Sequence, residues 1–395
     1  MTTVDLNILS EDYNRNPYFF IDRIDRNKKV IFDCSLNCKV AVGYDTVKEI
    51  LSKNNIFSTE PLAARAEPVM RGRVLAQMSG DEHRIKRSLI VRQITGNILK
   101  EFYEDFLSRI CDNIISDLIE RDEFDLISEF GMKYSMLSTF EILGVDSKEI
   151  NFYHERLKLI VKFATGFNLN DNEKNIYLSS SYELEDKILN LIEMKENNPG
   201  KDLISFIIDE NKKDIKKKIT NSEIVALVLN ILLAASEPVD KVLSTCIYHL
   251  YRNPTYLKEI LSGNRKPNDI LQESLRITPP VHLIPRLTTQ KYITSHGDIF
   301  DKGELVYLLI PAANRDPDYF EQPNVFDPNR NFKGHVSYGS GIHTCIGAQF
   351  ANLQLNLAIL KLAPLILSFN EKSYPIFDGV YTRGAIKYVL AKKNK

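Results

Sequence analysis

One cysteine, Cys345, lies in a glycine-containing loop that opens directly onto a helical pattern. The loop reads Tyr338-Gly339-Ser340-Gly341-Ile342-His343-Thr344-Cys345-Ile346-Gly347. Glycine permits backbone conformations and close approaches that a Cβ atom would block. The unpaired N–H groups and the dipole at the start of a helix favour a thiolate over a thiol. A thiolate held open against a flat partner suits the proximal position on a haem iron, so the loop predicts a haem ligand.

Three simpler interpretations of this cysteine were weighed against a haem ligand. A cysteine near a helix start is often only a small buried hydrophobic residue. A nucleophilic cysteine needs a base that reaches the sulfur, and His343 lies only two residues away in the same loop. The glycines lack the Gly-Lys-Ser/Thr ending of a phosphate-binding loop. The whole pattern therefore favours the haem ligand.

The Cys345 loop resembles the haem-binding signature of the cytochrome P-450 family, F-G-x-G-x-H-x-C-x-G, with Tyr338 where phenylalanine is usual. The resemblance implies a mainly α fold, a large helical domain with a small β region. It also implies haem b (iron protoporphyrin IX) as the cofactor, with the Cys345 thiolate as the axial metal ligand.

The two propionate groups of haem need cationic partners. His83 and Arg87 are four residues apart and match the family's H-x-x-x-R element, while Arg286 matches its strand arginine. His343 matches the histidine of the cysteine loop. The resemblance therefore implies that these four residues bind the cofactor. The neighbouring Arg84 and Lys86 would then face the proximal surface, where an acidic electron donor could dock.

A second motif, Glu273-x-x-Arg276, lies about seventy residues before the cysteine loop. Side chains at i and i+3 of a helix are neighbours. The resemblance implies a Glu–Arg–Arg network in which Arg330 joins this pair and braces the proximal loop. We assign these three residues to structure and not to chemistry.

Bulk composition is that of a soluble globular protein. The 395 residues carry a net charge of -1, which gives no indication of nucleic-acid binding, and five scattered cysteines give no zinc motif. The N-terminus shows no signal peptide. The longest apolar stretch, 224–235, contains Asn230 and is too short to span a bilayer. We expect a cytoplasmic monomer with no membrane anchor and a single domain over residues 1–395.

Periodicity predicts an order of mostly helical elements. Short strands are expected at 30–32 and 40–42, a helix at 46–53, and a long loop at 65–78. Amphipathic helices are expected at 94–120, 125–143, 147–165 and 179–197. A capping box, Thr220 to Glu223, starts a long helix that ends near residue 252. A helix at 270–276, strand-like residues at 281–311 and a last helix to about 367 complete the chain.

The long helix departs from the family pattern A-G-x-D/E-T, whose acid and alcohol help to deliver protons. This chain reads Ala234-Ala235-Ser236-Glu237-Pro238 there. Proline lacks an N–H and bends a helix. Protons must then come from water, Glu237, Ser236 or the substrate. We expect Glu237 to be catalytic, with Ser236 and Pro238 as its neighbours in the catalytic region.

Several segments resemble a narrower group within the family, the bacterial cyclo-dileucine oxidases: 65–72, 74–78, 232–235, 237–238 and 381–384. This resemblance implies oxidation of a cyclic dipeptide with two isobutyl arms, by hydroxylation of both ring nitrogens and desaturation of the ring. Such a neutral substrate needs apolar pockets and few polar contacts. The candidate substrate-binding residues are Arg65, Val74, Met78, Leu232, Leu233, Val281, Ile284 and Thr382.

Three functions were considered. A monooxygenase would take electrons from a ferredoxin or flavodoxin with an NAD(P)H-dependent reductase. A peroxide-driven peroxygenase acting on fatty acids is disfavoured, because Glu237 stands where such enzymes have an arginine and would repel a carboxylate. A haem-thiolate sensor without catalysis, or action on another small hydrophobic substrate, stays open.

Overall fold

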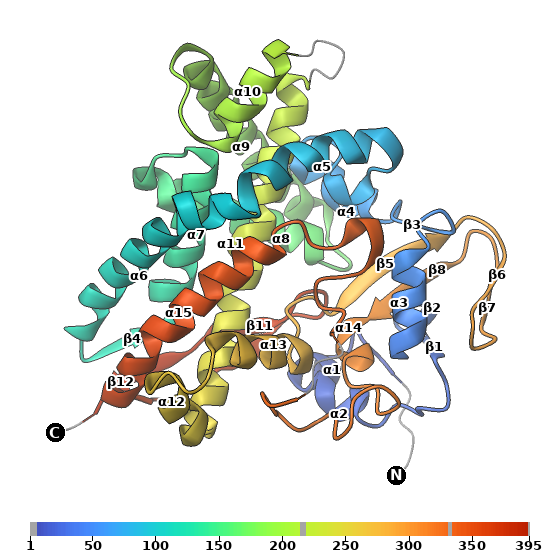
Figure 1. Cartoon of the computed structure of the whole chain (residues 1–395). Helices are drawn as coiled ribbons and strands as arrows, with labels where there is room; N and C mark the ends of the chain where they lie inside the picture. Colours follow the sequence, from blue (N-terminus) through green and yellow to red (C-terminus); the bar gives the residue numbers. More distant parts are fainter. Residues whose placement is uncertain (1–5, 214–218, 331–333, 394–395) are drawn as a thin grey trace.

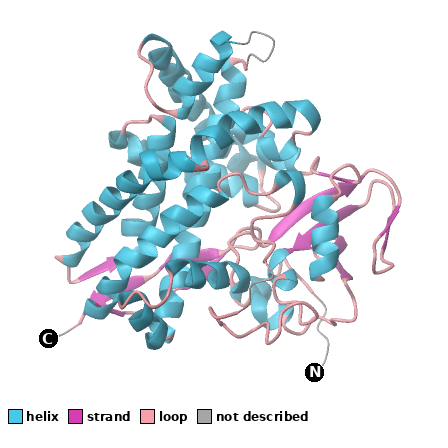
Figure 2. Cartoon of the chain, viewed as in Figure 1, coloured by secondary structure: helices cyan, strands magenta, loops and turns pink. Residues whose placement is uncertain are grey.

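A computed structural model describes residues 6–213, 219–330 and 334–393 (Figure 1). Helices fill one side of the molecule, and the strands of the largest sheet lie together on the other side (Figure 2). This arrangement confirms the expected mainly α fold with a small β region.

The helices vary from single turns to the 32 residues of α11. The α-helices are α1 (Glu11–Arg15), α2 (Pro17–Ile21), α3 (Tyr44–Ser52), α4 (Leu62–Met70), α5 (Gly80–Ile94), α6 (Glu104–Ile119), α7 (Met132–Leu143), α8 (Ile150–Thr165), α9 (Asp171–Asn197), α10 (Leu203–Lys213), α11 (Asn221–Arg252), α12 (Pro254–Leu261), α13 (Pro267–Ile277), α14 (Ile310–Ala313) and α15 (Ala348–Ser368). The short 3-10 and π turns are η1 (Leu75–Gln77), η2 (Leu99–Tyr103), η3 (Leu126–Gly131), η4 (Ser147–Glu149) and η6 (Gly341–His343).

The strands form one larger sheet and several small ones. They are β1 (Val30–Asp33), β2 (Cys38–Ala41), β3 (Phe57–Ser58), β4 (Glu123–Asp125), β5 (Leu283–Thr288), β6 (Tyr292–Ile293), β7 (Ile299–Phe300), β8 (Leu305–Leu309), β9 (Phe369–Glu371), β10 (Ile376–Asp378), β11 (Gly384–Lys387) and β12 (Val389–Lys392). The larger sheet has the order β1-β2-β8-β5-β3, in which only the β2–β8 pair is parallel. The hairpin β10–β11 returns its tip to the start of β5, where Thr382 pairs with Val281.

Helices α11 and α15 form the centre of the helical part (Figure 1). The predicted capping box starts α11, because the Thr220 hydroxyl accepts from the N–H of Glu223 and the Glu223 carboxylate accepts from the N–H of Thr220. Both helices are long and apolar enough, by length and composition alone, to cross a membrane. The predicted length rested on residues 224–235 alone, and that stretch is only part of the 32-residue helix α11. Within this fold both helices pack in the hydrophobic core.

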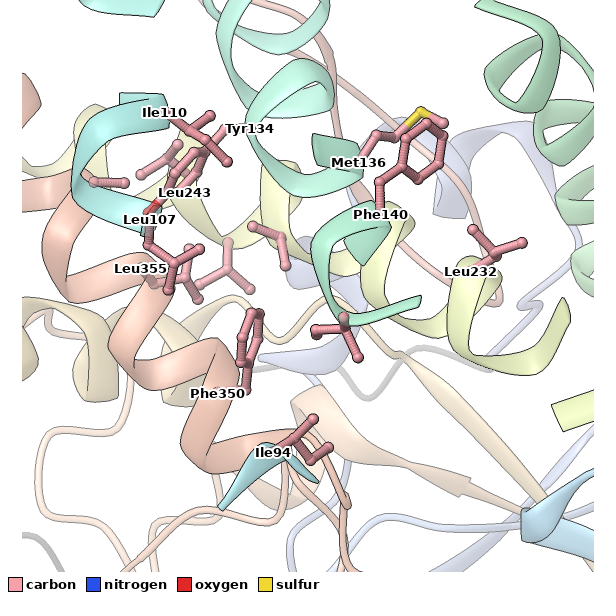
Figure 3. Close-up of a cluster of buried hydrophobic side chains, with 14 of the residues drawn as sticks. Ile94, Leu107, Ile110, Tyr134, Met136, Phe140, Leu232, Leu243, Phe350 and Leu355 are labelled. Carbon is pink, nitrogen blue, oxygen red and sulfur yellow. The ribbon is translucent and has the colours of Figure 1, made fainter. Parts of the chain in front are cut away.

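The main hydrophobic core lies where α6, α7, α11 and α15 meet. Leu107 of α6, Tyr134 of α7, Leu243 of α11 and Leu355 of α15 are all buried in this cluster (Figure 3). The hydroxyl of Tyr134 donates to the carbonyl of Gln354 at 3.1 Å, which satisfies a polar group inside the core. This core fixes the helix that follows the Cys345 loop.

Two expected segments were wrong in their local structure. Residues 65–78 do not form a loop: α4 and η1 occupy most of them, with Pro68 inside α4. Val69 and Met70 at the end of α4 are buried, and this burial offsets the unfavourable proline. The helix expected at 94–120 begins only after Gly96, because Ile94 ends α5 and Gly96 has a φ of +72° in the left-handed region.

One helix begins earlier than expected. Helix α9 starts at Asp171, because Asn170 and Glu173 form a reciprocal capping box ahead of it. The sequence carried this signal eight residues before the predicted start at 179.

Candidate active site

The Cys345 loop is fixed by backbone hydrogen bonds and one arginine. The N–H of Cys345 donates to the carbonyl of Tyr338 at 2.8 Å, and Arg87 of α5 donates to the carbonyl of Thr344 at 2.8 Å. Gly341 has a φ of +75°, and a Cβ there would lie 3.0 Å from the carbonyl oxygen of Leu51. Glycine is therefore required at this position by both conformation and space.

The side chain of Cys345 is exposed, yet burial of the sulfur among protein atoms is the largest influence on its pKa and raises it. The N–H groups of Gly347 and Ala348 and the charge of Arg87 lower the pKa, but by less. The expectation that the helix start alone favours the thiolate is therefore not met. A bound metal cation would supply the missing stabilisation, since a coordinating thiol loses its proton.

His83, Arg87, Arg286 and His343 come together beside this loop. The rings of His83 and His343 are 5.0 Å apart between centroids. Burial, His83 and the two arginines lower the pKa of His343 to about 4. Burial also lowers the pKa of Arg286 to about 10, and its Nε makes no hydrogen bond to the described part of the chain.

This group of four side chains has the composition of a site for carboxylates. Within the described ranges, neither Arg87 nor Arg286 forms an ion pair with an acidic side chain, and Nδ1 of His343 is buried without a partner. Buried cations without counter-ions are costly, so a ligand with acidic groups would stabilise them. The residues present therefore fit a haem, whose iron would meet Cys345 and whose propionates would meet these side chains.

The structure also brings Glu273, Arg276 and Arg330 together. Arg276 makes two hydrogen bonds to the Glu273 carboxylate, at 2.8 and 2.7 Å, and both side chains are fully buried. Nε of Arg330 lies 3.5 Å from the same carboxylate. Arg276 further donates to the carbonyls of Asn314, Pro323 and Val325. This network ties α13 to the loops that precede the cysteine.

Helix α11 continues without interruption through Pro238. The hydroxyl of Ser236 donates to the carbonyl of Leu232 at 2.5 Å, so it is bound to its own helix. Glu237 forms an ion pair with Lys241, and the hydroxyl of Thr382 donates to the same oxygen of Glu237 at 2.7 Å. Ala234 is exposed although it lies in the middle of a core helix.

The candidate pocket residues fall into two groups. Val74, Met78 and Leu232 are at most 3% exposed and belong to the main core, and Figure 3 labels Leu232 among its buried side chains. Little of their surface is therefore open to a ligand. The partly exposed candidates are Leu233, Val281, Ile284 and Thr382.

Arg65, the cationic member of the candidate set, is already engaged. It donates to the carbonyls of Ala164 and Gly166, at 3.3 and 2.9 Å. Its guanidinium also lies over the rings of Phe167 and Tyr381, 4.4 and 4.9 Å from their centroids. Arg65 thus joins α4, the end of α8 and the β10–β11 hairpin.

Sequence reasoning missed Lys241 and misplaced Lys86. Lys241 lies four residues after Glu237, so the helical i, i+4 spacing could have identified it. Lys86 does not face the proximal surface: it is buried and pairs with Glu82 and Glu223, because it ties α5 to the start of α11. Arg84 is exposed and pairs with Asp81.

A separate cavity of about 520 Å³ lies between α10 and the η2 turn. Phe102, Glu141 and Phe206 are among the residues that line it. Neither Cys345 nor any other candidate site residue lines this cavity.

An exposed cysteine before a helix, with arginines beside it that lack acidic partners among the described residues, is the arrangement expected of a haem-thiolate protein with a mainly α fold. The cytochrome P-450 family model matches residues 30–262 and 268–370, and the chain belongs to this family. It is a cytochrome P-450 monooxygenase, and its cofactor is haem with a cysteine thiolate as the axial ligand.

Known relatives cover nearly the whole chain. Pulcherriminic acid synthase of Bacillus subtilis strain 168 is 34% identical over 398 residues, which is 97% of this chain and 97% of the relative. The biotin biosynthesis cytochrome P-450 of the same organism is 24% identical and covers 93% of each chain. The crystal structure of the P-450 BioI with hexadec-9Z-enoic acid ligated acyl carrier protein superposes with a TM-score of 0.89. At 21% identity, covering 97% of this chain and 100% of that one, it supports the fold.

Proposed function

We propose that this monooxygenase oxidises cyclo(L-leucyl-L-leucyl) to pulcherriminic acid, by hydroxylating both ring nitrogens and desaturating the ring. The observation that carries this proposal is the similarity to pulcherriminic acid synthase, 34% identity over 97% of both chains. The segments that suggested a cyclic dipeptide oxidase, including the pair Glu237 and Pro238, lie within that range.

Cys345 is the proposed metal ligand, and His83, Arg87, Arg286 and His343 are the proposed partners of the propionates. When bound, a haem with a thiolate ligand supplies the activation of dioxygen for the oxidation. The Glu273–Arg276 pair keeps the loops before Cys345 in one arrangement, because a buried bidentate ion pair has little freedom to rearrange. The protein's own task is to place the substrate and to move protons.

The charges around the site favour a neutral substrate. Arg65 is occupied by two carbonyls and two aromatic rings, and Glu237 is neutralised by Lys241. A fatty acid carboxylate would therefore find no unpaired cation among these candidate residues. The isobutyl arms of a cyclic dipeptide suit the apolar side chains of Leu233 and Ile284. Val281 and Thr382 complete this proposed wall, and the set behind it is Val74, Met78 and Leu232.

Electrons would come from a ferredoxin or flavodoxin with an NAD(P)H-dependent reductase. Arg84 on α5 remains exposed and could contribute to docking, whereas Lys86 is buried and could not. We further propose that the protein works in the cytoplasm as a monomer with a single domain.

The test is turnover of cyclo-dileucine by the purified, haem-loaded protein with ferredoxin, reductase and NADPH. We expect the substrate to shift the Soret band and the product to carry two N-hydroxyl groups. Parallel reactions with peroxide alone, and with palmitate, address the peroxygenase alternative. Turnover of palmitate with peroxide, without turnover of the cyclic dipeptide, would contradict the proposal.

A matched pair of variants tests whether the substrate binds beside Ala234 of α11. Ala234→Leu places a larger side chain at an exposed position of α11, and we expect it to abolish the Soret shift while the haem remains bound. Ser179→Leu makes a similar change at an exposed position of α9 and should leave the shift intact. Equal loss in both variants would show that the effect is not local.

A further inference from the structure

Three side chains from two distant parts of the chain form a closed cluster. Nζ of Lys241 donates to Oε1 of Glu237, and both residues lie on α11. The hydroxyl of Thr382, at the tip of the β10–β11 hairpin, donates to the same Oε1 at 2.7 Å. The hydroxyl oxygen also accepts from Nζ of Lys241 at 3.1 Å. Each of the three groups therefore contacts the other two.

The cluster depends on a glycine in the adjacent strand. A Cβ at Gly384 would overlap the Cβ and Cγ of Lys241, because β11 lies directly against α11 at this point. The absence of a side chain at Gly384 lets the Lys241 stem pass along the strand to reach Thr382 and Glu237. The backbone of Thr382 is held separately by its pairing with Val281.

The cluster engages only one of the two carboxylate oxygens. Oε1 of Glu237 accepts from both Lys241 and Thr382, whereas Oε2 makes no hydrogen bond to any residue that the structure describes. The Glu237 side chain is 17% exposed, so water can reach this second oxygen. The two partners thus fix the orientation of the carboxylate and leave Oε2 for exchange with water.

We propose that Thr382 and Lys241 are positioning residues that hold Glu237 for proton transfer. In α11, Pro238 stands where the family pattern has a threonine. Thr382 of the β10–β11 hairpin thereby supplies the missing hydroxyl group. This inference rests on the proposed function, since it concerns the protons consumed by that oxidation.

The proton balance defines what Glu237 must do. Each N-hydroxylation consumes one dioxygen, two electrons and two protons; one oxygen atom enters the N–OH group and the other leaves as water. The reduced ferredoxin or flavodoxin supplies the electrons. Oε2 of Glu237 takes a proton from solvent water and passes it to water beside the bound substrate, while Thr382 and Lys241 keep their own protons and remain bound to Oε1.

The decisive comparison is Thr382→Val against Thr382→Ser, at saturating cyclo-dileucine. Valine keeps the shape and removes the hydroxyl, whereas serine keeps the hydroxyl and removes the methyl group. We expect Thr382→Val to lower the product formed per NADPH by roughly tenfold, which is less than the about 10²–10⁴-fold that positioned proton transfer contributes because Glu237 itself remains. Hydrogen peroxide should rise in compensation. Thr382→Ser should restore coupling, and both variants should keep the substrate-induced Soret shift.

Thermal unfolding gives a readout that requires no turnover. Thr382→Val should lower Tm in the parent and lower it less in a Glu237→Gln background, because the charged acceptor is then absent. Gly384→Ala leaves the three side chains chemically unchanged but displaces Lys241, and it should reproduce the uncoupling of Thr382→Val. Equal effects of Thr382→Val in both backgrounds would refute the cluster.

The two proposals fail in different ways. If the parent protein does not oxidise cyclo-dileucine, the proposed function fails, while the Tm comparison still tests the cluster. If the parent oxidises it and Thr382→Val is as well coupled as the parent, the proposed function stands and the positioning role is refuted. Equal uncoupling by valine and serine would assign Thr382 to packing and would also refute the role.

Discussion

Asp240 on α11 carries a carboxyl group whose Oδ1 is buried without a hydrogen-bond partner among the residues that the structure describes. The residue packs tightly against η3, since a Cβ added to Gly131 would lie 2.7 Å from the Cβ of Asp240. Burial raises the pKa of Asp240 from its usual 3.8 to about 7, although Lys241 lowers it and Glu237 raises it further. Replacing Asp240 with asparagine removes the ionisation and keeps the shape.

The sign and size of the effect follow from these two pKa values. The folded protein binds this proton more tightly than the unfolded chain, so stability falls as pH rises from about 4 to about 7 and is level above that. Between pH 5 and pH 7 the change is about 3 kcal/mol, at 1.36 kcal/mol per pH unit. Because Asp240 is not fully enclosed, solvent screening reduces the expected range to about 1–3 kcal/mol.

Urea unfolding at pH 5 and pH 8 measures this difference. The gain in stability from Asp240→Asn over the parent should be larger at pH 8 than at pH 5 by about 1–3 kcal/mol. The control is Asp186→Asn, at an exposed position in the middle of α9, which should give the same small change at both pH values. A pH-independent effect of Asp240→Asn, or a control with the same pH dependence, would refute the reasoning.

Four other outcomes are expected. Cys345→Ser should abolish the strongly red-shifted Soret band of the reduced carbon monoxide complex, and persistence of that band would exclude Cys345 as the ligand. Arg276→Lys should cost about 3–5 kcal/mol in urea unfolding, because it breaks a fully buried bidentate pair; a smaller loss than about 1 kcal/mol would argue against that network. Arg286→Leu should release haem to apomyoglobin about tenfold faster, since a charge-assisted bond is lost; an unchanged rate would remove Arg286 from the haem site. Both ring nitrogens of buried His282 lack partners, so a high-resolution crystal structure should show ordered water beside the ring, and a dry ring would contradict this.

Local spacing predicted much of the fold and of the site. The Cys345 loop, the start of α11 at Thr220 and the Glu273-x-x-Arg276 pair are each contained within a few residues. Their geometry depends on nearby backbone and on one helical turn, so the order of residue types was enough to place them. The irregular segments were less predictable: α4 contains Pro68, and only the burial of Val69 and Met70 in the folded core explains why it is helical.

The sequence by itself determined the class of fold, the cysteine and the residue types that a haem would need around it. Tertiary structure alone decided which distant groups meet. Thr382 reaches Glu237 across 145 residues, and Lys86 turns inward to Glu223 across 137. It also decided that burial, which raises the pKa of Cys345, outweighs the N–H groups of the helix start, which lower it. The physical reason is that burial and long-range pairing depend on which surfaces pack together, and residue spacing along the chain carries no direct record of that packing.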